Sequence, residues 1–136
     1  MPPSRLPVFA LLCFTIAALA QPASTYRYAR AGNPSNAAAT SRPGIALMGG
    51  GTDLDEAFSF LCDRAGGGDL LVLRATGGDD YNPYIQKLCH LNSVATVVIP
   101  NRNAAADAFV EQAIRHASAL FIAGMGIVVC LQATSQ

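Results

Sequence analysis

Apolar blocks alternate with helical patterns along the chain from residue 44 onwards. Four short runs are almost entirely apolar, which is typical of parallel strands whose two faces are both buried. These runs cover residues 44–49, 69–75, 93–100 and 119–124. Between them, apolar residues recur at spacings of three and four, which predicts amphipathic helices. The first predicted helix covers residues 52–63. The second is short, can be capped by Asp79 or Asp80 and runs to Leu91. The third is capped by Asn103, and its apolar stripe reaches Ala117.

This alternation of strands and helices predicts an α/β fold built on a parallel sheet. Polar residues stand where the first helix should begin. Thr52 or Asp53 can cap it, because a short side-chain oxygen accepts a hydrogen bond from a free backbone N–H. Asp55 and Glu56 lie in its first turn, where the helix dipole favours anions.

The chain begins with the features of a secretory signal peptide. Arg5 is followed by an apolar stretch over residues 7–20, which is short for a membrane-spanning helix and ends in small residues. We therefore expect residues 1–20 to be a signal peptide cleaved near the Ala20–Gln21 bond, and the protein to be exported. An uncleaved signal anchor is the alternative. Residues 21–43 are rich in Ala, Ser, Asn and Pro without an apolar period, which predicts a flexible linker.

Composition limits the classes of protein that this chain can belong to. It has 136 residues, of which nine are basic and nine acidic, and 51% are hydrophobic. That balance suits one small domain with a hydrophobic core. It argues against a nucleic-acid-binding protein, which needs a basic stripe or patch. Lys87 is the only lysine, so an anionic membrane surface is not indicated as a partner either.

Three cysteines follow the predicted signal peptide: Cys62, Cys89 and Cys130. An odd number in an exported chain leaves at least one of them unpaired. Cys89 and His90 are adjacent and would point about 100° apart on a helix, so they do not suit one metal ion. We therefore expect buried small hydrophobic residues, with no metal site and no cofactor.

A run of three glycines follows the first predicted strand. Gly49, Gly50 and Gly51 stand at a strand's carboxyl end, where open parallel sheets bind their ligands. Their backbone N–H groups and the helix N-terminus behind them suit a phosphate, a carboxylate or an oxyanion. Gly77 and Gly78 stand at the corresponding point after the second strand, so we include them among the candidate substrate- or anion-binding residues. The alternative is a tight turn that needs glycine for its geometry alone.

A nucleotide-binding Rossmann-like domain is a weaker alternative. The dinucleotide fingerprint needs Gly-x-Gly-x-x-Gly, and here Leu54 stands where the third glycine would be. An acidic residue should close the second strand to hold a ribose. Arg74 stands there instead, and Asp69 lies at the other end of that strand. An arginine at this position could meet a 2′-phosphate, but the chain has no Walker motif.

Three stretches together resemble the N-terminal part of the cyanophycinase and peptidase E family: "GIALMGGGTDLDEAF", "GGDLLVLRATGGDDYNPYI" and "ASALFIAG". The resemblance covers residues 44–124. It implies a flavodoxin-like α/β sheet with helices on both faces, related to class I glutamine amidotransferases. It also implies a serine hydrolase whose closest members are exported peptidases, with peptides or isopeptide-linked aspartyl polymers as substrates.

The same resemblance implies residues that this chain does not carry. After Gly124 the family has a second glycine, an acidic or amide residue and a glutamine, and a Gly-x-Ser-x-Gly elbow comes later. Met125 stands in place of that glycine, and residues 125–136 form a divergent apolar tail. We therefore expect a truncated, catalytically inactive version of a serine-type peptidase. The alternative function is a non-catalytic remnant or binding fragment.

Candidate catalytic residues within the chain agree with this expectation. A covalent hydrolase needs a nucleophile, a base and an orienting acid. The predicted elements place the available serines and histidines on helices or at the start of a strand, and none on a strand-to-helix elbow. The candidate nucleophiles are Ser59, Ser93, Ser118 and the cysteines, and the candidate bases are His90 and His116.

The flavodoxin-like strand order that the resemblance implies leads to two further expectations. The first two helices should lie on opposite faces of the sheet, so that Cys62 and Cys89 cannot form a disulfide. A simple Rossmann order would allow that bond. The tail could add a strand to the sheet, since "GIVVCLQ" has a suitable composition. A membrane tail over residues 119–131 is a weaker reading, because these apolar residues fall short of a span.

Overall fold

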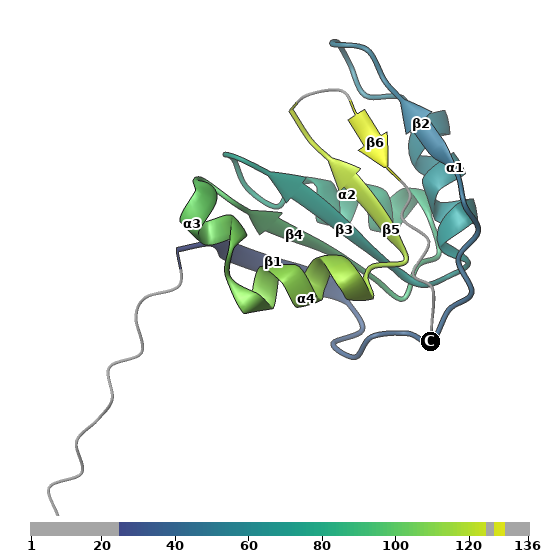
Figure 1. Cartoon of the computed structure of the whole chain (residues 1–136). Coiled ribbons are helices and arrows are strands. Elements are labelled where there is room, and N and C mark those ends of the chain that lie inside the picture. Colours follow the sequence, from purple (N-terminus) through teal and green to yellow (C-terminus); the bar gives the residue numbers. More distant parts are fainter. Residues whose placement is uncertain (1–24, 125–126, 130–136) are drawn as a thin grey trace, which may run out of the picture.

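The computed structural model describes residues 25–124 and 127–129, which form a six-stranded sheet flanked by helices (Figure 1). The strand order is β1-β4-β3-β5-β6-β2. The predicted signal peptide and its cleavage point lie outside the described residues. The strands are β1 (Arg27–Gly32), β2 (Ile45–Leu47), β3 (Asp69–Arg74), β4 (Ser93–Val98), β5 (Ala119–Ile122) and β6 (Ile127–Val129).

The four strands expected from the apolar runs are present and run in the same direction. β3 lies at the centre, with Leu71 in register with Ala95 of β4 on one side and Leu120 of β5 on the other. β6 is antiparallel to both β5 and β2, so β2 is parallel to β5. β1 pairs antiparallel with β4. The predicted α/β class is therefore confirmed, in a mixed sheet.

Helices cover both faces of the sheet, as expected, but their distribution differs from the flavodoxin-like order. α1 (Asp55–Ala65) and α2 (Tyr81–Leu88) pack on one face, and α4 (Ala108–His116) packs on the other (Figure 1). The chain steps in one direction from β2 to β3 to β4, and right-handed crossovers then place both connecting helices on the same face. The step back from β4 to β5 places α4 opposite.

The shared face of α1 and α2 overturns the expectation about the cysteines. Cys62 and Cys89 form a disulfide, with their Cα atoms 6.0 Å apart. The expectation was wrong because the chain continues in the same direction from β3 to β4, whereas a flavodoxin-like sheet reverses direction after its second strand. The bond joins the C-terminal half of α1 to the residue that follows α2.

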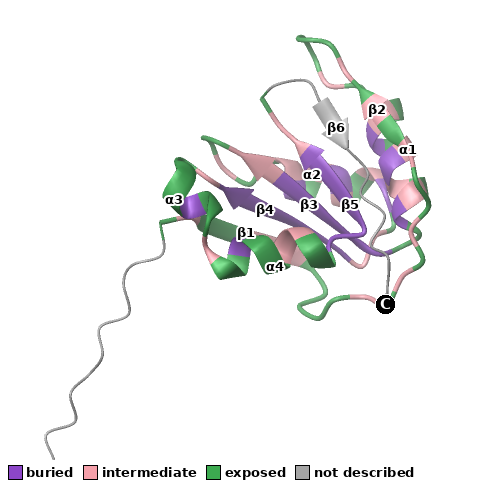
Figure 2. Cartoon of the chain, in the orientation of Figure 1, coloured by how far each residue is buried: buried purple, intermediate pink, exposed green. Residues whose placement is uncertain are grey.

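Two hydrophobic clusters form the core, one on each face of β3, β4 and β5. Buried residues are concentrated in these three strands (Figure 2). Phe58 of α1 is fully buried at the centre of the larger cluster, with its ring 4.9 Å from that of Phe121 and 5.5 Å from that of Tyr84. On the other face, Val110 of α4 is fully buried against Leu71 and Val97. The apolar stripes read from the sequence therefore face the sheet as predicted.

Residues 21–43 are not simply a linker, because β1 lies within them. Tyr28 and its neighbours form an edge strand paired over its whole length with β4. Its side chains are exposed or half-buried, so the strand lacks the continuous apolar run that identifies the central strands. Pairing with β4 stabilises β1, and sequence pattern alone could not reveal it.

The tail also contributes a strand, as expected for the segment after Gly124. β6 fills the position between β5 and β2. Ala119–Ile122 and Ile127–Val129 are thus sheet strands, which overturns the reading of residues 119–131 as a membrane tail. Among the described residues, no helix has the length and apolar character needed to cross a membrane.

The helix ends differ in detail from the predicted caps. Leu54 is the N-cap of α1 and makes no side-chain cap hydrogen bond, so the prediction of Thr52 or Asp53 as the cap was wrong. Asp80 is the N-cap of α2, also without such a bond. The third predicted helix is split into α3 (Arg102–Ala105) and α4, capped by Asn101 and Asp107 and not by Asn103. Gly66 ends α1 in the left-handed conformation, with φ of 61°.

These caps predict a measurable difference between two substitutions. Asp107→Ala removes the hydrogen bond that the carboxylate accepts from the Phe109 N–H at 2.8 Å, and should lower the free energy of unfolding by about 1 kcal/mol. Thr52→Ala removes no cap and should change it by less than about 0.5 kcal/mol. Urea denaturation of both variants checks this. An equal loss in both would show that α1 is capped by Thr52 after all.

Candidate ligand site

An open cavity of about 450 Å³ lies where β3 ends and α1 and α2 begin. This is the carboxyl edge of the parallel strands, the edge at which open α/β sheets bind ligands. The cavity combines one cation, two carboxylates and three hydroxyl groups, two of which belong to aromatic rings. Its lining residues are Thr52, Asp53, Arg74, Asp80, Tyr81 and Tyr84.

Arg74, the last residue of β3, supplies the positive charge of this cavity. Its Nη1 donates to the Gly78 carbonyl at 2.9 Å and lies 3.4 Å from the Asp80 carboxylate. Its guanidinium also lies over the Tyr81 ring, 5.2 Å from the ring centroid. The Arg74 side chain is about one-fifth exposed, whereas that of Asp80 is almost fully exposed. Because the Asp80 carboxylate is exposed, solvent weakens its attraction to the arginine.

Two tyrosines join the start of α2 to the region around the start of α1. The Tyr81 hydroxyl donates to the Asp53 carboxylate at 2.6 Å, and the Tyr84 hydroxyl donates to Asp55. Burial, followed by the hydrogen bond to Asp53, raises the pKa of Tyr81 to about 12. The hydrogen bond to Asp55, followed by burial, raises the pKa of Tyr84 to about 12. Both hydroxyls therefore stay protonated and remain donors at neutral pH.

These tyrosines predict a late step in an alkaline titration. Tyr81 and Tyr84 should ionise near pH 12, above the ordinary tyrosine pKa of 10.0, while the chain is folded. Because their folded-state pKa values are raised, their contribution to stability is complete below pH 10 and is lost as the pH rises through 12. Absorbance at the tyrosinate band should therefore show two groups fewer ionising near pH 12 in a Tyr81→Phe/Tyr84→Phe variant. An unchanged late step would contradict the two hydroxyl–carboxylate bonds.

The first set of predicted glycines lies beside this cavity in the chain but does not line it. Gly49, Gly50 and Gly51 are exposed and immediately precede Thr52 and Asp53. A Cβ atom added to any of the three would meet no atom of the described chain within 4 Å. Their backbone also avoids the left-handed region. At these three positions the turn therefore shows no steric need for glycine.

The second set of predicted glycines, Gly77 and Gly78, makes hydrogen bonds within the protein. Gly77 has φ of 96°, and a Cβ atom there would overlap the Arg74 guanidinium. Its carbonyl accepts a hydrogen bond from Arg27 of β1, and the Gly78 carbonyl accepts one from Arg74. Gly77 is thus required so that Arg74 can fold back over the turn. The turn therefore positions Arg74, and the carbonyl groups of the turn face the guanidinium groups of Arg27 and Arg74.

The candidate nucleophiles of the sequence are engaged elsewhere. The Ser93 hydroxyl donates to the buried Asp69 carboxylate at 2.5 Å, and the Ser118 hydroxyl accepts from the Asp69 N–H at 3.3 Å. Cys62 and Cys89 are bonded to each other. Ser59, His90 and His116 are exposed, and none of the three lines the cavity at the carboxyl edge. In the described part of the chain, no group of three or more potential metal ligands is found either.

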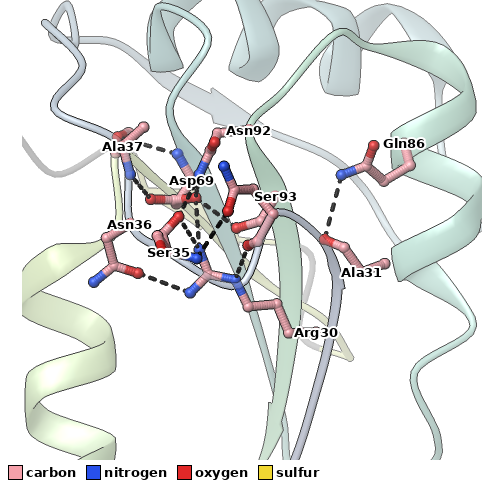
Figure 3. Close-up of polar contacts among 11 residues, drawn as sticks. Arg30, Ala31, Ser35, Asn36, Ala37, Asp69, Gln86, Asn92 and Ser93 are labelled. Carbon is pink, nitrogen blue, oxygen red and sulfur yellow. Dashed lines mark hydrogen bonds and ion pairs between the residues drawn. The ribbon is translucent and has the colours of Figure 1, made fainter.

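Asp69 forms a buried polar cluster at the opposite end of β3 (Figure 3). One carboxylate oxygen accepts from Asn92, Ser93 and Arg30, and the other accepts from the Ala37 N–H. Burial acts to raise the pKa of Asp69, but the hydrogen bonds from Ser93, Asn92 and Ala37, with the Arg30 charge, hold that pKa below 3.8. Sequence reasoning placed Asp69 at the start of a strand but could not find its partners.

A smaller cavity of about 150 Å³ borders the Asp69 cluster, between β1 and α4. Its polar atoms from Arg30, Asp69 and Ser93 are already hydrogen-bonded within the protein. The cavity at the carboxyl edge is therefore the better candidate site. Comparisons with protein-family models, with curated proteins and with solved structures find no match for this chain.

Proposed function

We propose that this chain is an exported, non-hydrolytic relative of the cyanophycinase and peptidase E family, and that it binds a peptide-like ligand in the cavity at the carboxyl edge of the sheet. The observation that carries the proposal is the convergence of Arg74, Asp53 and Tyr81 on that cavity. The family part rests on the resemblance of residues 44–124 described above, with its peptide and aspartyl-polymer substrates.

The chemistry of the cavity supports a peptide-like ligand. A peptide carries carboxylate and carbonyl acceptors, which suit the Arg74 guanidinium as a charge-assisted donor. It also carries amide and ammonium donors, which suit the carboxylates of Asp53 and Asp80. The Tyr84 ring supplies apolar contact area beside these polar groups. The uncharged, sterically open turn of Gly49, Gly50 and Gly51 lets a ligand backbone approach closely.

Binding without hydrolysis is supported by the state of the candidate nucleophiles. Ser93 and Ser118 both bond to Asp69 at the far end of β3, and Cys62 is in a disulfide. A serine or cysteine nucleophile needs a base within hydrogen-bond reach. Among the described residues, both histidines lie outside the cavity that holds Arg74.

Export is supported by two independent features. Residues 1–20 have the sequence pattern of a signal peptide. The bond between Cys62 and Cys89 is a structural disulfide, which persists in oxidising compartments and is rare where thiols are kept reduced.

Calorimetric titration of the purified chain with α-aspartyl and β-aspartyl dipeptides tests the proposal. We expect binding without product formation, and no serine labelling by a fluorophosphonate probe. Arg74→Gln should weaken binding at least about tenfold, because a charge-assisted hydrogen bond contributes on the order of 1.5 to 3 kcal/mol. Arg42→Gln is the matched control: Arg42 pairs with Asp63 on the surface and should leave binding unchanged.

Three outcomes would overturn the proposal. Turnover with a labelled serine would identify a hydrolase. Binding of a nucleotide phosphate in place of the dipeptides would favour the Rossmann-like alternative. Equal binding by the Arg74→Gln variant would show that the ligand lies outside this cavity.

A further inference from the structure

Exposed apolar side chains concentrate at one edge of the sheet. Five large hydrophobic residues are exposed in the described chain; two of them lie in β2, and a third is the N-cap of α1. Ile45 is 65% exposed, Leu47 73% and Leu54 56%. The remaining two, Tyr28 and Phe109, contact each other with ring centroids 4.9 Å apart. The exposed residues of β2 thus stand out as a surface that the described chain leaves uncovered.

β2 is the last strand of the sheet, so one of its backbone edges has no partner among the described strands. Side chains alternate between the two faces of a strand. Ala46 packs against the cluster that contains α1, whereas Ile45 and Leu47 point to the other face. The uncovered surface therefore combines a free backbone edge with two neighbouring aliphatic side chains.

The two edges of the sheet differ in how they are protected. Natural edge strands avoid pairing with other chains by carrying charges or by being covered. β1, at the opposite edge, carries Arg27 and Arg30. Residues 43–52, which contain β2 and both of its flanks, hold no charged residue. The β2 edge is protected only by its short length, and it carries no charge that would oppose a second strand.

We propose that two copies of this chain associate through antiparallel pairing of their β2 edges, centred on Ala46. In that register Ile45 of one copy lies opposite Leu47 of the other, and each apolar side chain gains an apolar partner. The arrangement is symmetric, because the same three residues supply both sides of the contact, as a two-fold interface requires. It joins the two sheets into one. This inference is independent of the proposed ligand.

A second copy fits this surface better than a charged partner for a physical reason. A two-fold axis places identical groups near each other, so a charge close to the axis would repel its own copy. The uncharged stretch of residues 43–52 removes that cost. The pairing also satisfies backbone N–H and C=O groups that are otherwise left to water.

Sedimentation velocity of the purified chain, and of variants that carry opposite charges on β2, tests the inference. The unmodified chain should sediment as a dimer at a concentration on the order of 100 µM, because an interface centred on a three-residue strand is small and associates weakly. The variants Ile45→Lys/Leu47→Lys and Ile45→Glu/Leu47→Glu should each sediment as monomers, because like charges then lie opposite each other. An equimolar mixture of the two should regain the dimer. Ala108→Lys, on the exposed surface of α4, is the control and should stay dimeric.

Circular dichroism of each variant confirms that it is folded. A monomeric unmodified chain would overturn the inference. So would a dimer that persists in both charged variants, since it would then form through another surface. A mixture that stays monomeric while both variants are folded would also contradict the β2 register.

Discussion

Replacing Asp69 with alanine is expected to lower the free energy of unfolding by about 3 to 5 kcal/mol, the range typical of breaking a buried ion pair by removing one partner. The Asp69 side chain is 10% exposed and that of Arg30 is 17% exposed, so solvent screens this pair weakly. The carboxylate also accepts hydrogen bonds from Asn92, Ser93 and the Ala37 N–H. All of these donors lose this acceptor together, although Arg30 and Asn92 keep bonds to the segment after β1 (Figure 3).

The expected loss is large because Asp69 connects segments far apart in the sequence. Arg30 belongs to β1, Ala37 to the segment after it, and Ser93 to β4. The carboxylate therefore holds the N-terminal segment against the sheet. Guanidinium denaturation measures the effect. Asp63→Ala is the matched control: its ion pair with Arg42 is more than half exposed and should change the free energy of unfolding by less than about 1 kcal/mol.

The same cluster predicts how stability depends on acid. The folded-state pKa of Asp69 lies below the ordinary aspartate value of 3.8. Its contribution is therefore complete at pH values above about 4 and is lost as the pH falls through the folded-state pKa. Asp69→Asn should be less stable than the unmodified chain at neutral pH, and the difference should narrow below pH 4. A difference that is independent of pH would show that the Asp69 charge does not stabilise the fold.

The parts of the fold that local sequence encodes could be predicted well. Each of β3, β4 and β5 is a run of buried apolar residues, so periodicity identifies it. β1 was not predicted, because an edge strand with exposed and half-buried side chains has no such apolar run. The strand order could not be predicted for a different reason. Whether β2 lies beside β3 depends on which strand edges pair in the folded chain, and the local sequence pattern does not encode that choice.

The candidate site was predicted only as far as the strand ends. Chain order placed Arg74 and the glycines at the carboxyl edge correctly, because parallel strands all end there. The bonds from Tyr81 to Asp53 and from Tyr84 to Asp55 could not be foreseen, because they depend on α1 and α2 sharing a face. Asp53 was interpreted as a helix cap, and in the structure its carboxylate accepts the Tyr81 hydroxyl instead. A short polar side chain near a helix start serves either role, and only tertiary packing decides between them.

Removal of the disulfide is the second prediction with a large expected effect. A Cys62→Ala/Cys89→Ala variant should lose about 3.5 kcal/mol of unfolding free energy. The cross-link spans a sequence separation of 27 residues, and chain entropy gives this magnitude for a loop of that size. Urea denaturation with and without a reductant measures it. Reductant should lower the stability of the unmodified chain to that of the variant and leave the variant unchanged.

The disulfide and the candidate site are connected through the two helices that they share. Cys62 and Cys89 join the C-terminal parts of α1 and α2, and the tyrosine–aspartate bonds join their N-terminal ends. If the disulfide holds the helices side by side, its removal should also loosen these bonds and lower the pKa of Tyr81 from about 12 towards 10.0. An alkaline titration of the reduced chain checks this. Stability that does not respond to reductant would show that the two helices are held on one face by the Phe58 cluster alone, without a covalent link.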